Sequence, residues 1–333
     1  MRDPSFWWRP AGMAAGLLSP LGAIYGAVAG ARMAQAGRDA GVPVVCIGNL
    51  TLGGAGKTPA AILAAQILAT ASRNPFVLSR GYGGALAGPV RVDPQRHRAA
   101  DVGDEPLLLA RAAPTMVARD RVAGAAAARS AGAGSIVMDD GFQSPNLRKD
   151  LSILVVDGRR GVGNAQVFPA GPLRAPLDAQ LRRAGAVLVI GPGAAGDAVE
   201  SVARAHGLRV LHGRLQPDAA ALAALSAKPV LAFAGIGDPE KFFATLTEAG
   251  VDVRARVSFP DHHRFSRSDA MGLSERATRE NLLLLTTEKD MARLSGDADA
   301  AALAAASRAL PVRLAVTEEG DFQDLILRAA SQV

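Results

Sequence analysis

VPVVCIGNLTLGGAGKTP, residues 42–59, is the stretch that decides the fold. It begins with an apolar, β-branched run, which is typical of a strand buried on both faces of a parallel sheet. A glycine-rich turn follows, and the alanine-rich residues 60–69 predict a helix directly after that turn. A strand, a glycine-rich turn and a helix in this order predict a loop that holds a phosphate chain at the helix N-terminus.

The residues of this loop indicate how it would bind a nucleotide. Glycines let successive backbone N–H groups point into one concavity, a lysine adds a mobile positive charge, and a threonine offers a hydroxyl to Mg²⁺. The expected contacts are Gly53, Gly54, Ala55, Gly56, Lys57 and Thr58. Thr51 stands where the pattern G-x-x-x-x-G-K-[ST] has its first glycine, so an ordinary glycine-rich turn remains the alternative.

Composition narrows the class of protein. The 333 residues suggest roughly two domains, and 49% apolar residues supply a sizeable core. Cys46 is the sole cysteine, so no intramolecular disulfide forms, and its place in a buried strand favours packing over catalysis. The net charge of +6 favours an anionic membrane surface or a phosphorylated substrate. No basic block with interleaved aromatic residues is present, which disfavours nucleic acid.

The N-terminal residues 5–34 are the least polar part of the chain. A bilayer is crossed by about 20 apolar residues, and this segment is long enough. Pro20 and the arginines on both flanks leave open whether it spans the membrane or lies on it. Four aromatic residues suit a membrane interface: Phe6, Trp7, Trp8 and Tyr25. The alternatives are a helical hairpin buried against the domain and a cleaved signal peptide, the latter disfavoured by the nucleotide site downstream.

Acidic residues follow or precede three of the predicted elements. SIVMDD, residues 135–140, predicts a strand that ends at Asp139 and Asp140, where a Mg²⁺-binding carboxylate is expected beside a phosphate loop. If the strand continued, adjacent side chains would point to opposite faces, so one carboxylate would point away from the metal. Asp104 and Glu105 precede a leucine-rich segment; either they are the first acids of a helix, or one faces the reaction centre.

Three polar stretches in the second half are further candidates. Residues 161–177 are rich in glycine and proline and predict a loop over the sheet edge, with Arg174 as an anion contact. SFPDHHRFS, residues 258–266, contributes either a partner of a general base, a phosphate contact or a surface turn. Its adjacent histidines disfavour a zinc site. TTEKD, residues 286–290, is either a phosphate-facing turn or an ordinary helix start.

Strands alternate with helix-sized segments along the whole chain, which predicts an α/β fold. The segment near 216–229 is the best candidate for a domain boundary. We therefore expect an N-terminal hydrophobic, membrane-associated segment at 1–34, a phosphate-loop domain at 35–220 and a smaller α/β domain at 221–333.

Several separated motifs carry a family resemblance: GNLTLGGAGKTP, LSRGYGG, VGDEPLLLA, DDGFQ with RKDLSILVVD, FPAGPLR, FAGIGDPEKFF, FPDHHRFS and TTEKD. In this order, from about residue 5 to 295, they resemble the tetraacyldisaccharide 4′-kinase family. The resemblance implies a P-loop kinase domain of three α/β/α layers, a second, smaller α/β domain and an N-terminal membrane-associated helix. It also implies transfer of the γ-phosphate of ATP to the 4′-hydroxyl of a tetraacyldisaccharide 1-phosphate, a step of lipid A biosynthesis.

The same resemblance implies roles for individual residues. Lys57 and Thr58 would hold the ATP phosphates and Mg²⁺, and Asp139 and Asp140 would complete the metal region. The catalytic group would be Asp104, His262 and Lys57, with Asp104 oriented by His262 or, as the second choice, His263. Ala175 follows Arg174 where the family usually has glutamate, so no role is transferred to that position.

The resemblance also implies a place in the cell and partners. The kinase would work at the cytoplasmic face of the bacterial inner membrane, as a peripheral protein or with a single N-terminal anchor, and no nucleic acid or obligate protein partner is inferred. Asp104 and the histidines lie on different predicted domains, so we expect domain closure to assemble the site. The rival interpretations are a P-loop GTPase or metallochaperone, which lacks its N/T-K-x-D motif here, and a membrane-bound nucleotide sensor.

Overall fold

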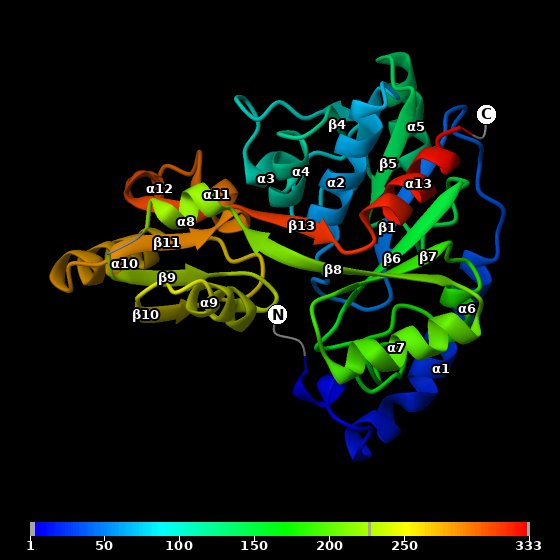
Figure 1. Ribbon diagram of the computed structural model, residues 1–333, viewed down its shortest axis with the longest axis horizontal. Coiled ribbons are helices and arrows are strands. Elements are labelled where there is room, and N and C mark those ends of the chain that lie inside the picture. The colour runs from blue at the N-terminus through cyan, green and yellow to red at the C-terminus, as the bar shows by residue number, and fades with distance from the viewer. Residues whose placement is uncertain (1–3, 226–227, 332–333) are drawn as a thin grey trace.

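The computed structural model describes residues 4–225 and 228–331, which form two α/β units side by side (Figure 1). The large unit is built on a nine-stranded sheet of order β13-β8-β7-β6-β1-β5-β2-β4-β3. Its strands are β1 (Val44–Asn49), β2 (Pro75–Ser79), β3 (Val90–Arg91), β4 (Thr115–Val117), β5 (Ser135–Asp139), β6 (Leu151–Asp157), β7 (Ala186–Ile190), β8 (Arg209–Pro217) and β13 (Val312–Val316). All neighbours are parallel except the two edge strands β3 and β13.

The prediction of a buried parallel strand is confirmed, because β1 lies between β5 and β6 and all six of its residues are buried. Helices cover both faces of the sheet, which makes three α/β/α layers. On one face lie α2 (Lys57–Thr70) and α13 (Glu319–Ala329), where small alanines of α2 pack directly on the strands. On the other lie α5 (Arg121–Ser130), α6 (Leu177–Leu181) and α7 (Ala194–Ala205). Cys46 is buried in this second core, as expected of a packing residue.

The small unit is a four-stranded parallel sheet of order β10-β9-β11-β12. Its strands are β9 (Val230–Ala234), β10 (Val253–Ser258), β11 (Leu283–Thr287) and β12 (Ser307–Leu310). One face packs on α9 (Pro239–Glu248) and the other on α10 (Arg267–Arg279) and α12 (Ala301–Ala306). Two short helices complete the junction with the large unit: α8 (Ala219–Ala223) and α11 (Glu288–Leu294).

The sequence-based boundary of the small domain, 221–333, is wrong at its C-terminal end. After β12 the chain returns to the large sheet, where β13 pairs antiparallel with β8 and α13 packs beside α2. Phe322 and Ile326 of α13 are fully buried in the core that α2 also lines. These side chains pack in the core between α2 and the large sheet, so the C-terminal segment belongs to that unit. The ribbon of β8 and β13 joins the two units (Figure 1).

The N-terminal segment forms a single-turn helix, η1 (Ser5–Trp8), and a long helix, α1 (Met13–Met33). Among the described residues, α1 is the one helix that is both long enough and apolar enough to cross a membrane, by length and composition only. Gly22 and Gly26 lie close to the 161–177 loop, because a Cβ at Gly22 would lie 2.9 Å from the Val167 backbone oxygen. A stripe on α1 is exposed instead: Met13, Leu17, Leu21, Ile24 and Val28.

One alternative and one expectation for the N-terminal segment are wrong. It is one mostly exposed helix, not a buried helical hairpin, because only 17% of its apolar window is buried. Trp7 does not lie at an exposed interface, because it is buried and its Nε1 donates to the Pro169 oxygen at 3.0 Å. Trp8 is also engaged within the protein, with the Arg160 guanidinium 4.9 Å above its ring. Both tryptophans therefore hold the start of the chain against the large unit.

Candidate active site

The phosphate loop follows β1 at the carboxyl edge of the sheet, and α2 begins at Lys57. Gly56 has φ +91°, and a Cβ there would lie 2.8 Å from Ile190 Cδ1, so both conformation and space require glycine. Asn49 braces the loop, because its Nδ2 donates to the Thr51 oxygen at 2.7 Å and to the Gly53 oxygen at 3.1 Å. These two hydrogen bonds fix the first half of the loop.

Thr51, which replaces the first glycine of the common pattern, has a structural explanation. It forms an isolated antiparallel bridge with Leu173, and its oxygen accepts from Arg174 Nε at 2.9 Å. Extended backbone of this kind suits any residue, and β-branched residues particularly. The 161–177 loop thus lies over the sheet edge, as predicted, and is joined to the first position of the phosphate loop.

Two neighbouring aspartates lie beside the loop, because β5 is the parallel neighbour of β1. Asp139 ends β5, is buried, and its Oδ1 has no hydrogen-bond partner among residues 4–225 and 228–331. Burial, together with the charges of Glu105 and Asp140, raises the pKa of Asp139 to about 7. A buried, unpaired carboxylate oxygen is the kind of group that a cation satisfies.

The strand ends at Asp139, and Asp140 lies in a turn with φ +49°. The two carboxylates therefore diverge because of this turn, and not because the strand continues. Asp140 accepts two hydrogen bonds from Arg174, at 2.6 and 3.1 Å, and pairs with Lys57 Nζ at 3.7 Å. Burial would raise the pKa of Asp140, but the charges of Lys57 and Arg174 outweigh it and hold the pKa below its ordinary value. Burial also lowers the pKa of Lys57, an effect that Asp140 opposes. The structure thus pairs Arg174 with a carboxylate of the protein, and its predicted contact with a bound anion stays a prediction.

Asp104 begins α4 (Asp104–Leu109), which contacts α2, and both predicted roles of this acid are compatible with its position. It lies in the first turn of the helix, yet its side chain is only 4% exposed. Its Oδ2 lies 3.3 Å from His262 Nδ1 and 2.7 Å from Arg293 Nε. Burial would raise the pKa of Asp104, but the hydrogen bond from His262 and the charge of Arg293 hold it well below its ordinary value.

The structure brings His262, and not His263, to Asp104. His262 sits at a turn with φ +55°, its ring lies 5.1 Å from that of Tyr82, and the hydrogen bond to Asp104 raises its pKa. His263 faces elsewhere, with its Nε2 3.0 Å from Asp269 Oδ2 and its ring stacked on Phe259. Of the two histidines, His262 is therefore the one that the structure places beside Asp104.

Residues 286–290 form a helix start, because the Thr287 side chain accepts from the Asp290 backbone N–H at the beginning of α11. Sequence reasoning missed two cations of this helix. Lys289 Nζ lies 2.5 Å from Glu105 Oε1, and Arg293 reaches Asp104. The available signal was spacing, because two cations four residues apart share one face of a helix. Arg121 was also missed; it is buried, and its Nη2 donates to the backbone oxygen of Asp139 at 3.1 Å.

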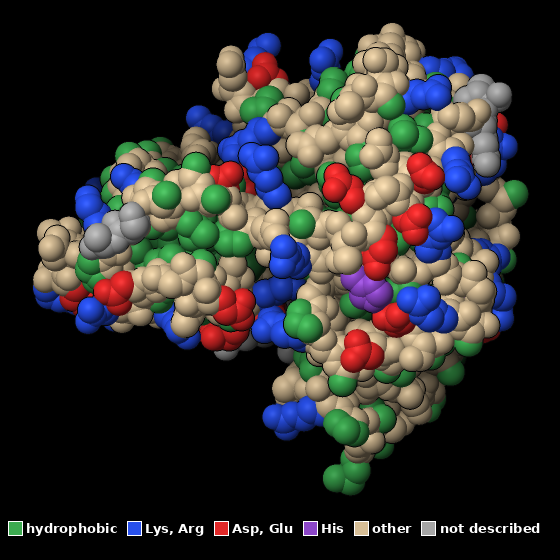
Figure 2. Space-filling model, in the orientation of Figure 1, with side chains coloured by type: hydrophobic (Ala, Val, Ile, Leu, Met, Phe, Trp, Pro, Cys, Tyr) green, Lys and Arg blue, Asp and Glu red, His purple; other side chains and the backbone are tan. Residues whose placement is uncertain are grey.

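A second set of ion pairs joins the two units near the phosphate loop. Lys241 Nζ lies 2.8 Å from Asp157 Oδ2, and Arg159 pairs with Asp238 at 2.9 Å. The small unit also approaches the phosphate loop itself, because a Cβ on Gly237 would lie 3.7 Å from the Gly54 nitrogen. The small unit therefore meets the phosphate loop directly, and basic side chains gather along this junction on the face shown in Figure 2.

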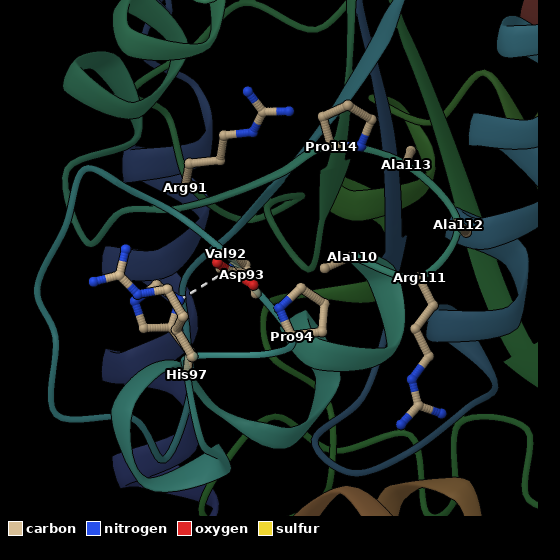
Figure 3. Close-up of a pocket in the computed structure, with 11 residues that line it drawn as sticks. Arg91, Val92, Asp93, Pro94, His97, Ala110, Arg111, Ala112, Ala113 and Pro114 are labelled. Carbon is tan, nitrogen blue, oxygen red and sulfur yellow. Dashed lines mark hydrogen bonds between the residues drawn. The ribbon is translucent and has the colours of Figure 1, made fainter.

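Two cavities lie away from these residues. One, of about 980 Å³, is lined by Arg91 at the end of β3, by the segment that follows it and by residues 110–114 before β4, and Arg91 and Arg111 extend to opposite sides of it (Figure 3). The other, of about 520 Å³, lies between α1 and the 161–177 loop, and Gly22, Gly26 and Pro176 are among the residues that line it. The candidate catalytic residues line neither cavity, so they form a separate site at the junction of the units.

A family model described as tetraacyldisaccharide-1-P 4′-kinase matches residues 14–331. The chain belongs to this kinase family. The tetraacyldisaccharide 4′-kinases of Nitrobacter winogradskyi and Methylobacterium sp. are 51% and 57% identical to it, over 100% and 96% of this chain and 99% and 94% of their own lengths.

A solved structure supports the assignment to the tetraacyldisaccharide 4′-kinase family. It is a crystal structure described as the "apo" form of LpxK from Aquifex aeolicus in complex with ATP. It is 26% identical in sequence, with a TM-score of 0.73, and the match covers 95% of this chain and 99% of that one. The sequence-based prediction of the family and of the α/β architecture is thus confirmed.

Proposed function

We propose that this protein transfers the γ-phosphate of ATP to the 4′-hydroxyl of a tetraacyldisaccharide 1-phosphate in lipid A biosynthesis. The membership of the tetraacyldisaccharide 4′-kinase family over nearly the whole chain supports the reaction. The observation that carries the mechanism is the buried Asp104, held by His262 at the junction where the small unit meets the phosphate loop.

The phosphate loop would bind the nucleotide. Its glycines free the backbone N–H groups of residues 53–58, and the first turn of α2 adds the favourable end of a helix dipole. Lys57 is held near Asp140 and would exchange part of that contact for the phosphate chain. Its lowered pKa comes from burial, and an incoming polyanion would restore the charged form.

A Mg²⁺ ion fits the residues beside the loop. Asp139 offers a buried oxygen that has no partner among the described residues, and Thr58 places a hydroxyl at the start of α2. No group of three or more His, Cys, Asp or Glu side chains in the described ranges is arranged to hold a metal by itself, so the nucleotide would supply further oxygens. Bound Mg²⁺ would offset negative charge on the transferred phosphoryl group. Asp140 would act beside it by holding Lys57 and Arg174.

Asp104 would accept the proton of the sugar hydroxyl as the phosphoryl group is transferred. A sugar hydroxyl is a poor nucleophile at neutral pH, and a general base contributes about 10²–10⁴ in rate. The depressed pKa of Asp104 keeps it ionised throughout the physiological range. His262 would orient the carboxylate through the contact at 3.3 Å and stabilise its charge.

The exposed stripe of α1 supports work at a membrane, where an acylated substrate resides. Met13 and Leu17 are 89% and 81% exposed, far more than isolated surface apolar residues require. Because the opposite face of α1 packs on the large unit at Gly22 and Gly26, we infer that the helix lies in the interface and does not span it. The cytoplasmic face of the inner membrane, where ATP is available, is the side we propose.

The deciding experiment measures phosphate transfer from labelled ATP to a detergent-dispersed tetraacyldisaccharide 1-phosphate. The intact protein should transfer phosphate, Lys57→Ala and Asp104→Ala should retain only a small residual rate, and the exposed control Arg276→Lys should match the intact protein. Asp104→Ala should still bind ATP, because Asp104 lies outside the phosphate loop. ATP binding without transfer by the intact protein would favour the sensor interpretation, and GTP turnover would favour the GTPase.

A further inference from the structure

Arg293 is a buried cation at the junction of the two units, and the transfer step proposed for Asp104, Lys57 and Mg²⁺ makes no use of it. Its side chain is 7% exposed. Nε donates to Asp104 Oδ2 at 2.7 Å, and Nη1 donates to the Gly235 oxygen at 2.7 Å and to Asp290 Oδ1 at 2.8 Å. The guanidinium thus reaches the proposed base from the small unit and is anchored there at two further points.

The rest of α11 holds Arg293 in place. Asp290 is fixed by the Gly235 N–H at 3.0 Å and by the Thr287 hydroxyl at 2.6 Å. Ala292 is buried in a cluster with residues of α4, among them Leu107 and Leu108. A rigid helix that packs on α4 leaves the guanidinium little freedom to move away from Asp104.

The hydrogen bonds of Asp104 indicate what this contact achieves. A carboxylate has about four acceptor sites. Oδ2 receives Arg293 and His262, and Oδ1 receives the Glu105 backbone N–H at 3.0 Å. Across the described residues, that leaves one site, on Oδ1, for a substrate hydroxyl. Two donors on Oδ2 fix the carboxylate plane and so fix the direction of the remaining lone pair.

Arg293 makes this contact at a cost to its own hydrogen bonding. In the part of the chain that the structure describes, its Nη2 is buried and has no partner. Buried N–H groups without partners are rare in native proteins, and each one calls for an explanation such as a catalytic role. The orientation of the guanidinium therefore serves the hydrogen bonds to Asp104, Gly235 and Asp290 and leaves Nη2 without one among the described residues.

We propose that Arg293 is a positioning residue for the transfer step, which the small unit supplies to hold Asp104 with one oxygen free for the sugar hydroxyl. This inference rests on the proposed role of Asp104 as the base. Arg293 acts through Asp104, so its loss should lower kcat and leave the KM for ATP and for the lipid acceptor nearly unchanged. A lysine at this position keeps the charge but cannot serve three acceptors from one planar group.

A double-mutant cycle tests the proposal. Arg293→Lys and Arg293→Met are made in the intact protein and in Asp104→Ala, and kcat is measured for all with Arg276→Lys as the exposed control. In the intact background we expect kcat to fall about tenfold for lysine and about 10²-fold for methionine, the loss typical of a misplaced catalytic group. In the Asp104→Ala background the same substitutions should change the residual rate less than about twofold.

The outcomes separate the proposal from its alternatives. Equal losses in both backgrounds would show that Arg293 acts independently of Asp104 and would overturn the positioning role. A loss that accompanies weaker ATP binding and a lower Tm in Arg293→Lys would show a purely structural role and would overturn it as well. If the intact protein itself transfers no phosphate, the proposed function fails, and that result is visible before any Arg293 variant is made.

Discussion

Gly56→Ala is the substitution that tests the geometry of the phosphate loop most sharply. A side chain at φ +91° costs about 1–2 kcal/mol in backbone strain. The added Cβ would also lie 2.8 Å from Ile190 Cδ1, a contact that requires movement and costs about 1–3 kcal/mol more. We expect the free energy of unfolding to fall by about 2–5 kcal/mol. ATP affinity should fall as well, because the loop shifts.

The two contributions can be separated with Ile190→Val, which removes the offending Cδ1. The next atom, Ile190 Cγ1, would lie 4.0 Å from the new Cβ, which is an ordinary contact. Ile190→Val alone should cost about 0.5–1.5 kcal/mol. The double variant should be more stable than the sum of the single effects predicts, by about 1 kcal/mol or more.

Denaturant unfolding of the four proteins measures this coupling, and calorimetric titration with ATP measures the binding. Gly272→Ala is the matched control, because a Cβ there meets no atom within 4 Å and φ is ordinary, so stability should stay the same or rise by up to about 1 kcal/mol. Strict additivity of Gly56→Ala and Ile190→Val would refute the steric part of the reasoning. An undiminished stability of Gly56→Ala would refute both parts.

Four other parts of the molecule predict measurable effects of substitution. His262→Gln should reduce the free energy of unfolding below about pH 6.5, the ordinary pKa of the imidazole, and the difference should vanish as the pH rises through the raised folded pKa, as titrated by denaturant unfolding. Asp139→Asn should raise the Mg²⁺ concentration for half-maximal transfer by at least about tenfold, and an unchanged Mg²⁺ requirement would remove Asp139 from the metal site. Leu17→Asp and Ile24→Asp should each lower the binding constant for vesicles, measured by sedimentation, by at least about tenfold, and should leave the Tm unchanged. Phe322→Ala should cost about 3–5 kcal/mol in unfolding free energy, and a negligible cost would contradict the assignment of α13 to the core of the large unit.

The parts of the fold that the sequence predicts are those in which local pattern and tertiary environment agree. The run that became β1 is apolar and β-branched, and its central position in the sheet buries it completely. The phosphate loop and α2 lie within a few residues of it, so one short window holds the whole signal. Asp139 was placed correctly at the end of its strand for the same reason.

The parts that the sequence did not predict depend on contacts between distant segments. β13 is a short strand with no local sign of its partner, and it joins β8 from almost one hundred residues away. Arg293 meets Asp104 across 189 positions, so only the mutual placement of the two units reveals the pair. Trp7 has the composition of a membrane-interface residue, yet the Pro169 oxygen gives its indole N–H a partner inside the protein.

The ribbon of β8 and β13 has a consequence for synthesis. The small unit leaves the large one after β8 and returns just before β13, and the Asp218 N–H donates to the Pro311 oxygen at 2.9 Å where the two crossings meet. The small unit is therefore an insertion, complete before the last strand leaves the ribosome. Until then β8 is an unpaired sheet edge and one face of the large core lacks α13. A chain that stops after residue 311 would thus contain every proposed catalytic residue and still be prone to aggregation.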